Sequence, residues 1–250
     1  MELAQQSYIE DLLVRMAFNS NAIEGSTLTL AETEVIYEGE FVSGKPGREQ
    51  VAARRIFEAS AFLEDALESD APLDQDLIRD LHERCALDLQ PRARGSYRST
   101  PAIIRASRTV PLAAHKIRSA MDDLVFGYGQ LVEEQGALPA IAWFHAAFER
   151  IHPFADGNGR TGRLLMNHQL QQAEFPPIAI KVDNSREYKT SLEAWQADED
   201  PARFIRLFSS CLEEELSKRI AFLSEGIPAE ASRSQQALQL LKEDPALTAA

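Results

Sequence analysis

Apolar residues recur at intervals of three and four over most of this chain, with polar residues between them. This spacing places apolar side chains on one face of a helix, so it predicts amphipathic helices. The first is expected over about 4–24, where Gly25 is a natural stop, and Thr29-Leu30-Ala31-Glu32 is typical of a capping box that opens the second. The same spacing predicts further helices over about 51–63, 74–87, 115–131, 140–151, 188–197 and 201–222. The chain is therefore expected to be all-α.

The helical pattern is interrupted between residues 94 and 111, where Gly95, Pro101 and Pro111 disfavour helix. Within this stretch, Ala102-Ile103-Ile104 and Thr109-Val110 are short runs of residues that favour strands. We therefore expect one short β-hairpin in an otherwise helical fold.

With 250 residues, of which 44% are hydrophobic, the chain is long enough for one well-formed core. We expect a main domain over residues 1–226 and a C-terminal tail over residues 227–250. The formal net charge of −13 has the wrong sign for a surface that holds nucleic acid. Nucleic acid is therefore not expected as a partner of this chain.

The setting indicated by the sequence is cytoplasmic. Cys85 and Cys211 lack the spacing of a zinc site or a disulfide framework, which fits a reducing compartment. Residues 1–11 lack a basic stretch followed by an apolar one, so no secretory signal is expected. The most apolar run, 137–148, is too short to cross a bilayer, so no membrane contact is expected.

The segment His152-Pro153-Phe154-Ala155-Asp156-Gly157-Asn158-Gly159-Arg160-Thr161-Gly162-Arg163 has a composition that packing alone does not require. Its glycines and asparagine let backbone N–H groups turn inward and form a concave nest for phosphate oxygens. The apolar residues that follow predict a helix, whose first N–H groups point to the same spot. Arg160 and Arg163 are three residues apart, on one face of its first turn, and guanidinium groups bind phosphate bidentately.

Two further groups in this segment carry chemistry. Asp156 can hold a divalent metal against phosphates, and His152 can take or give a proton near neutral pH. A single histidine, glycine-rich turn or arginine pair is more often structural than functional. Their joint occurrence in one short segment predicts an active site that handles phosphate groups.

This segment resembles the Fic family signature H-P-F-x-D/E-G-N-G-R-x-x-R, with every specified position matched. The similarity extends over roughly residues 12–216 and therefore covers a whole domain. It implies a compact Fic-type helical bundle with a β-hairpin flap over the active site. Gly95-x-Tyr97-Arg98 looks like the approach to that flap, and His82 is expected to be a core histidine or one that supports the site, rather than a catalyst.

Most members of that family move AMP from ATP onto a hydroxyl side chain of another protein and release pyrophosphate. The resemblance implies that His152 is the general base for a Ser, Thr or Tyr hydroxyl and that Asp156 holds Mg²⁺. Gln196 stands about where relatives often carry an asparagine, which leaves the identity of the base open. The residues implied for nucleotide binding are Phe154 as an apolar anchor of the loop, Gly157, Asn158 and Gly159 around the phosphates, Arg160 at the β-phosphate, Arg163 at the γ-phosphate and Tyr188 beside the base.

The segment Ser20-Asn21-Ala22-Ile23-Glu24-Gly25 matches the family's inhibitory pattern S/T-x-x-x-E-G/N. Ser20 and Glu24 are four residues apart and share one helix face. The resemblance implies a salt bridge between Glu24 and Arg163. Because one guanidinium cannot serve a carboxylate and a γ-phosphate in the same productive geometry, the chain is expected to be autoinhibited.

Other interpretations stay open at this point. The same site would also suit removal of AMP from a modified protein, with Glu24 orienting the attacking water, and a nucleotide-sensing regulator whose DNA-binding part is absent is a further alternative. A kinase-like toxin branch of the superfamily is disfavoured because it carries alanine at the position of Gly157. A protein target is expected to dock at the flap, about residues 98–111, by strand addition, and a homodimer is left open. The tail is similar to the start of a winged-helix domain, or is an ordinary C-terminal helix.

Overall fold

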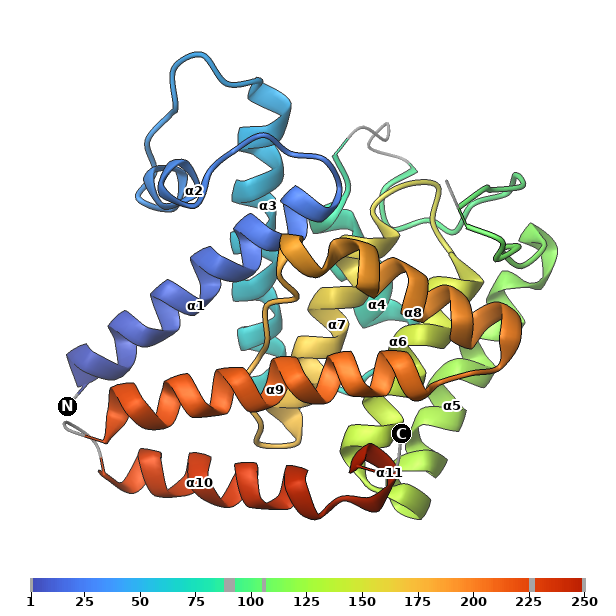
Figure 1. The fold of residues 1–250 in the computed structure, drawn as a ribbon. Coiled ribbons are helices and arrows are strands. Elements are labelled where there is room, and N and C mark those ends of the chain that lie inside the picture. The colour runs from blue at the N-terminus through green and yellow to red at the C-terminus, as the bar shows by residue number, and fades with distance from the viewer. Residues whose placement is uncertain (1, 88–92, 105–106, 225–227, 249–250) are drawn as a thin grey trace.

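A computed structural model describes residues 2–87, 93–104, 107–224 and 228–248 (Figure 1). These residues form helices joined by turns and loops, and no β-strand occurs among them, which confirms the all-α prediction. The α-helices are α1 (Glu2–Ile23), α2 (Leu30–Tyr37), α3 (Gly47–Glu68), α4 (Gln75–Cys85), α5 (Ile117–Gln135), α6 (Ala137–Ile151), α7 (Asn158–Gln172), α8 (Ser185–Asp198), α9 (Ala202–Leu223), α10 (Pro228–Glu243) and α11 (Pro245–Thr248). Two short 3-10 helices are η2 (Ala114–Lys116) and η3 (Val182–Asn184).

Helix α7 lies at the centre of the bundle, in contact with α1, α3, α4 and α6 (Figure 1). Every residue from Arg160 to Leu170 is buried, so this helix is surrounded along most of its length. A helix that is buried on all sides belongs to the core of the protein. The N-terminus of α7 is therefore held in place by the whole bundle.

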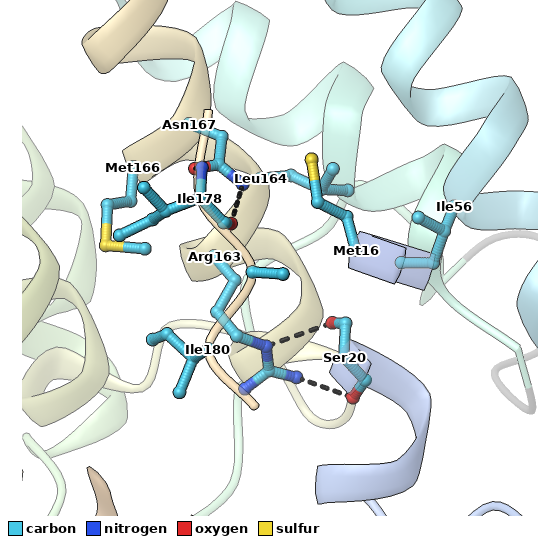
Figure 2. A pocket seen from close by; sticks show the side chains of 10 residues that line it. Met16, Ser20, Ile56, Arg163, Leu164, Met166, Asn167, Ile178 and Ile180 are labelled. Carbon is cyan, nitrogen blue, oxygen red and sulfur yellow. Dashed lines mark hydrogen bonds between the residues drawn. The ribbon is translucent and has the colours of Figure 1, made fainter. Parts of the chain in front are cut away.

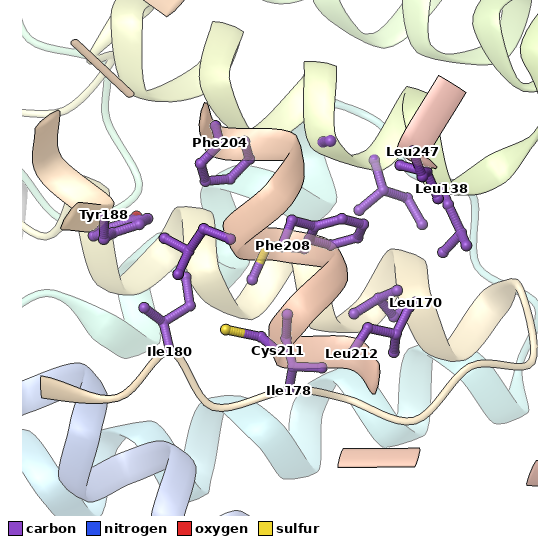
Figure 3. Packing of buried hydrophobic residues seen from close by; sticks show 14 of the residues in the cluster. Leu138, Leu170, Ile178, Ile180, Tyr188, Phe204, Phe208, Cys211, Leu212 and Leu247 are labelled. Atoms are coloured by element: carbon purple, nitrogen blue, oxygen red, sulfur yellow. The ribbon is translucent and has the colours of Figure 1, made fainter. Parts of the chain in front are cut away.

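Two hydrophobic clusters pack on opposite sides of α7. One joins α3, α4 and α5 to α6 and α7 and includes Phe148 and Phe154. The other joins α6 and α7 to α8 and α9 around Phe204 and Phe208 (Figure 3). Because apolar burial is the main driving force of folding, these two clusters fix where α7 begins.

The C-terminal tail is part of the second cluster. Helix α10 packs along α9, and α11 contacts α6 and α9. Leu241 and Leu247 are buried in that cluster. Residues 228–248 thus pack as helices on the bundle, and the winged-helix assignment stays a prediction.

Local sequence signals set the ends of α1 and α2 as predicted. Gly25 has φ 97°, and the N–H groups of Gly25 and Ser26 donate to the carbonyls of Ala22 and Asn21 in a Schellman motif. Thr29 and Glu32 form the reciprocal capping box, with the Glu32 N–H donating to the Thr29 hydroxyl and the Thr29 N–H donating to the Glu32 carboxylate.

Helix α1 is anchored to the neighbouring α9 and η3 by polar side chains. Both Nη groups of Arg15 donate to the buried Glu215 carboxylate on α9, at 2.8 and 2.9 Å, and the Tyr8 hydroxyl donates to the same group. Nearer its C-terminal end, Asn19 Oδ1 accepts from the Val182 N–H at 2.9 Å. These contacts fix both the position and the rotation of the helix that carries Ser20 and Glu24.

The predicted β-hairpin is not formed by the described residues, so this prediction was wrong. Residues 101–104 and 107–113 have irregular backbone, and residues 105 and 106 between them lie outside the described residues. Ile103 and Val110 are 86% and 82% exposed, so a strand pair here would have no apolar surface to pack against. A lone two-stranded hairpin is only marginally stable in water, which explains the absence of strands.

Among the described residues, no helix combines the length and the apolar content needed to span a bilayer.

Candidate functional site

The loop between α6 and α7 begins with a backbone reversal at His152. This residue caps α6 in the left-handed region, with φ 51° and ψ 60°, and its N–H donates to the Phe148 carbonyl at 2.9 Å. A non-glycine residue in this region is uncommon and persists only where its surroundings hold it. Residues outside the loop therefore hold His152 in this conformation.

His82 on α4 is the first of these residues. Its ring stacks on Phe154 at 3.6 Å with an interplanar angle of 1°, and Phe154 is fully buried. His82 Nδ1 accepts from the Gly95 N–H at 2.9 Å, so the proton of the neutral ring is on Nε2, which donates to the Asp156 carbonyl at 2.9 Å. Burial lowers the pKa of His82 to about 4, so this neutral form is the stable one. The supporting role expected for His82 agrees with this geometry.

Arg98 is the second constraint, and the sequence did not mark it as a site residue. Its N–H donates to the Pro153 carbonyl at 2.9 Å, and its Nε donates to the His152 carbonyl at 2.7 Å. The rest of the guanidinium donates to the carbonyls of Ile151, Thr100 and Leu112. One buried arginine thus connects the loop between α6 and α7 to the start of the flap segment, residues 98–111, and to the residue that follows it.

Asn158 closes the loop from inside. Its Oδ1 accepts from the Phe154 N–H at 2.9 Å, and its Nδ2 donates to the Phe154 carbonyl at 2.8 Å. Gly157 caps α7 with φ 78°, a conformation that favours glycine. The first N–H groups of α7 have no partner within the helix, and such groups suit the binding of an anion.

The two arginines of the loop have different partners. Arg160 Nη1 donates to the Cys85 carbonyl at the end of α4, at 2.9 Å, and its Nη2 forms an ion pair with Asp156 at 3.2 Å. Arg163 instead points to α1. Helix α7 begins at Asn158, so both arginines lie within its first two turns.

Arg163 is bound by α1 through three hydrogen bonds. Its Nε donates to Ser20 Oγ at 2.9 Å and its Nη2 to the Ser20 carbonyl at 3.0 Å, as Figure 2 shows. The same Nη2 forms an ion pair with Glu24 Oε1 at 2.7 Å. The Glu24 side chain is 45% exposed, whereas that of Arg163 is 6% exposed. A cavity of about 20 Å³ between α1 and α7 adjoins Ser20 and Arg163.

The contact with Arg163 lowers the pKa of Glu24. Burial alone would raise it, but the charge of Arg163 and its hydrogen bond outweigh burial and hold the pKa below its usual value. Glu24 is therefore ionised at neutral pH and remains a partner for Arg163.

Gly159 brings the backbone of α7 close to this ion pair. A Cβ atom at this position would lie 2.5 Å from Glu24 Oε1 and 2.9 Å from Arg163 Nη1, closer than real contacts allow. An alanine at this position would therefore require the Glu24 carboxylate and the Arg163 guanidinium to shift.

The two side chains expected to act on substrate, those of His152 and Asp156, belong to this loop. Burial lowers the pKa of His152, partly opposed by the nearby backbone carbonyl of Glu149, so its imidazole is neutral and able to accept a proton. The Asp156 carboxylate is 42% exposed. Among the described residues, no three His, Cys, Asp or Glu side chains form a group that could hold a metal ion. A single accessible carboxylate fits Mg²⁺ that arrives with substrate phosphates, because this ion keeps most of its other ligands as phosphate oxygens and water.

Tyr188 lies beneath Arg163, with its ring 5.9 Å from Arg163 Cζ. It is only 3% exposed, and its hydroxyl is bonded to His145 Nε2 at 2.8 Å. His145 Nδ1 faces the Gly162 carbonyl, which can only accept, so Nε2 is the acceptor and the Tyr188 hydroxyl donates. Tyr188 thus packs against the guanidinium of Arg163. Its stacking on a nucleotide base stays a prediction.

Glu149 and His145 are further residues at the site that sequence reasoning missed. Both are buried on α6 and face Gly162, where a Cβ atom would lie 2.6 Å from Glu149 Oε1. The sequence offered no clear signal for His145, because His152 ends α6 in a left-handed conformation and the helical spacing does not carry over to it. It offered no signal for Glu149 either.

Fold and site together define a helical protein with a glycine-rich loop that carries two arginines at the start of a buried central helix. Residues 72–170 match the Fic/DOC family, and through this domain the chain belongs to that family. The matched region contains α4 to α7 up to Leu170 and therefore His82, Arg98 and the whole loop.

Curated and solved relatives agree with this assignment. The chain is 33% identical over 225 residues to the protein adenylyltransferase Fic of Nematostella vectensis, which covers 88% of this chain and 51% of the relative. The chain thus spans about half the length of this relative. The structure of Fic-1 (aa134–508) from Caenorhabditis elegans has a TM-score of 0.81 at 25% identity, over 90% of this chain and 67% of the other. A Fic family protein from Desulfovibrio desulfuricans has a TM-score of 0.68 at 27% identity, over 95% of this chain and 78% of the other.

Proposed function

We propose that this chain transfers AMP from ATP to a hydroxyl side chain of a protein target and that Glu24 inhibits the reaction. The observation that carries the proposal is that His152, the N-terminus of α7 and two arginines converge on one loop, with Arg163 held by Ser20 and Glu24. The names of the relatives as protein adenylyltransferases support the same activity.

In this reaction, a target hydroxyl oxygen forms a bond to the α-phosphorus, and the bond from that phosphorus to pyrophosphate breaks. His152 accepts the hydroxyl proton as general base. Its Nδ1 is buried, which leaves Nε2 as the nitrogen that faces a substrate. The N–H groups at the start of α7 stabilise the phosphate oxygens, and Arg160 and Arg163 bind the phosphates that leave.

Asp156 would hold Mg²⁺, which when bound neutralises charge on the phosphates. Its ion pair with Arg160 is compatible with this role, because at 42% exposure the carboxylate retains an accessible side. The chain's own residues therefore supply one ligand, and the nucleotide supplies others.

Inhibition follows from the shared use of Arg163. While its Nη2 is paired with Glu24, the guanidinium cannot bind a γ-phosphate in the same geometry. ATP is then expected to bind with its α-phosphorus misplaced, and such misplacement by about 1 Å can cost on the order of 100-fold in rate.

Labelled ATP provides the test. With ATP labelled at the α-phosphate, Glu24→Gly is expected to increase automodification or target modification, and His152→Ala in the same background to abolish it. Glu68→Gly, which also removes a glutamate at a helix end but lies on the exposed end of α3, is the matched control and should behave as the unchanged protein. No gain for Glu24→Gly over this control would refute the inhibitory role.

The ionised, half-exposed Glu24 also favours a second candidate, the removal of AMP from a modified protein. In that reaction Glu24 would orient the attacking water. Incubation of an AMP-modified target with the unchanged protein distinguishes transfer from removal. Release of AMP by the unchanged protein, together with no release by Glu24→Gly, would indicate removal.

The flap segment is the proposed place for the protein target. Ile103 and Val110 present exposed apolar side chains there, and the irregular backbone around them has no strand partner among the described residues. An Ile103→Asp variant is expected to lose target modification and keep its affinity for ATP. Loss of ATP affinity as well would indicate that the segment only covers the nucleotide.

A further inference from the structure

A second pocket lies away from the ion pair, at the base of the flap segment. Its volume is about 330 Å³. It is formed by α4, by the residues just before Arg98 and by the start of α5. The lining residues are Arg79, Ser96, Tyr97, Ala114, His115, Ile117 and Arg118.

The lining of this pocket is cationic in a chain with a net charge of −13. Two of its seven residues are arginines and one is a histidine, and none is acidic. A local cluster of this sign in an acidic protein attracts anions at short range, where the rest of the surface repels them.

The two guanidinium groups are available to a ligand in different ways. Arg79 Nε donates to the Gly95 carbonyl at 2.8 Å, which fixes the plane of the group. Its other contact is with Asp76 at 3.4 Å, whose side chain is 85% exposed, and ion pairs of this kind are weak. Arg118 is exposed and makes no ion pair with any of the described residues.

Both positive charges act on Tyr97, which also lines the pocket. Burial raises the pKa of the Tyr97 hydroxyl, and the charges of Arg79 and Arg118 oppose that rise. Asp122 and Asp76 act in the opposite direction, but neither lines the pocket. The Tyr97 hydroxyl itself is engaged with Gln75 Oε1 at 2.8 Å, so the tyrosine serves as a rigid wall.

This pocket is directly connected to the catalytic loop. The Tyr97 ring lies 5.4 Å from Phe154, the residue that anchors the loop. The next residue, Arg98, donates to the carbonyls of His152 and Pro153. A group bound in the pocket would therefore lie beside the segment that positions the general base.

We infer that this pocket binds an acidic side chain of the target polypeptide, either a carboxylate or a phosphorylated residue, and holds it beside the flap segment. The inference rests on the proposed transfer of AMP to a protein. The position at the base of the flap segment favours a polypeptide ligand, because a chain that lies along residues 98–104 continues toward Ser96 and Tyr97.

Direct binding tests the pocket without catalysis. The probes are three fluorescein-labelled peptides of equal length, one of alternating Ser and Glu, one with Gln in place of Glu and one with phosphoserine in place of Glu, followed by fluorescence polarisation. The glutamate or phosphoserine peptide is expected to bind at least about tenfold more tightly than the glutamine peptide, as expected for a charge-assisted contact. Arg118→Gln should remove that difference, whereas Lys116→Gln, an equal charge change on η2 outside the pocket lining, should leave it.

Three binding results would overturn the inference. Equal binding of all three peptides would show that the acidic group does not contribute, and equal losses in Arg118→Gln and Lys116→Gln would indicate only general charge attraction. Binding of inorganic phosphate that depends on Arg118, while no peptide binds, would make the pocket a site for a free anion.

Catalysis then separates this inference from the proposed function. In the Glu24→Gly background, the glutamate peptide extended by one threonine is expected to show an increased KM in Arg118→Gln with unchanged kcat. If no peptide is modified but Arg118-dependent binding persists, the proposed function is refuted and the inference about the pocket is retained. If modification occurs with the same KM in both proteins, the pocket inference fails and the function stands.

Discussion

Replacement of Glu149 by glutamine should change how the stability of the fold depends on pH. Glu149 is 9% exposed, and its Oε1 has no hydrogen-bond partner among the described residues. Burial raises its pKa from 4.5 to about 7, although the charge of Arg163 opposes the shift. The folded protein therefore binds a proton at this position more tightly than the unfolded chain does.

The size of the effect follows from the two pKa values. Because the folded pKa is the higher one, the stabilisation is complete below pH 4.5 and is lost as the pH rises through 7. A shift from 4.5 to about 7 corresponds to roughly 3 kcal/mol at about 1.36 kcal/mol per pKa unit. Between pH 5.5 and 8.5 the folded protein should lose roughly 2 kcal/mol of this amount.

Urea unfolding at several pH values measures this loss, with the Glu149→Gln variant as the reference. The variant is needed because His82, His145 and His168 have pKa values lowered by burial, to about 4, 3 and 4, and they change stability in the opposite direction. Glutamine has nearly the same shape and does not titrate, so the difference between the two proteins isolates Glu149. A difference that stays constant between pH 5.5 and 8.5 would refute the assignment of a raised pKa to this carboxyl.

Further predictions concern the loop and its supports. Gly159→Ala should weaken the contact of Glu24 with α7 because its Cβ would lie 2.5 Å from Glu24 Oε1, and a thermal melt should show a loss of stability that Gly129→Ala, which has no atom within 4 Å, does not. Arg98→Gln should lower kcat for AMP transfer at least about tenfold by releasing the His152 carbonyl, with a smaller change in ATP affinity measured by calorimetry. His82→Phe should keep the stacking on Phe154 but lose the hydrogen bond to the Asp156 carbonyl, and proteolysis of the loop is expected to become faster.

Features encoded by neighbouring residues were predictable from the sequence. The capping box of Thr29 and Glu32 and the stop at Gly25 depend on contacts between residues at most five apart, so a short window contains their cause. The ion pair of Glu24 with Arg163 joins residues far apart in the chain, and it was predicted only because each partner lies in a recognisable family motif.

Features that depend on distant backbone atoms were not predictable in this way. Arg98 binds five residues through their backbone carbonyls, and a carbonyl carries no signal in the sequence. The hairpin was predicted from strand propensity in Ile103 and Val110, but propensity is overridden where the side chains have no surface to pack on. At the flap segment the residues favour strands, but their tertiary environment does not support them. Disagreements of this kind are common at functional sites.

The double contact of Ser20 with Arg163 has a consequence for an activated form of the protein. An arginine side chain carries about 2 kcal/mol of rotamer entropy, which is normally lost when it binds a phosphate. Here Ser20 holds Arg163 through two bonds that do not involve Glu24, so loss of the Glu24 carboxylate leaves the guanidinium already aligned. Under the proposed function, the end of α1 and the Glu24 that follows it thus have opposite effects on Arg163, and removal of the whole segment should activate less than removal of the Glu24 carboxylate alone.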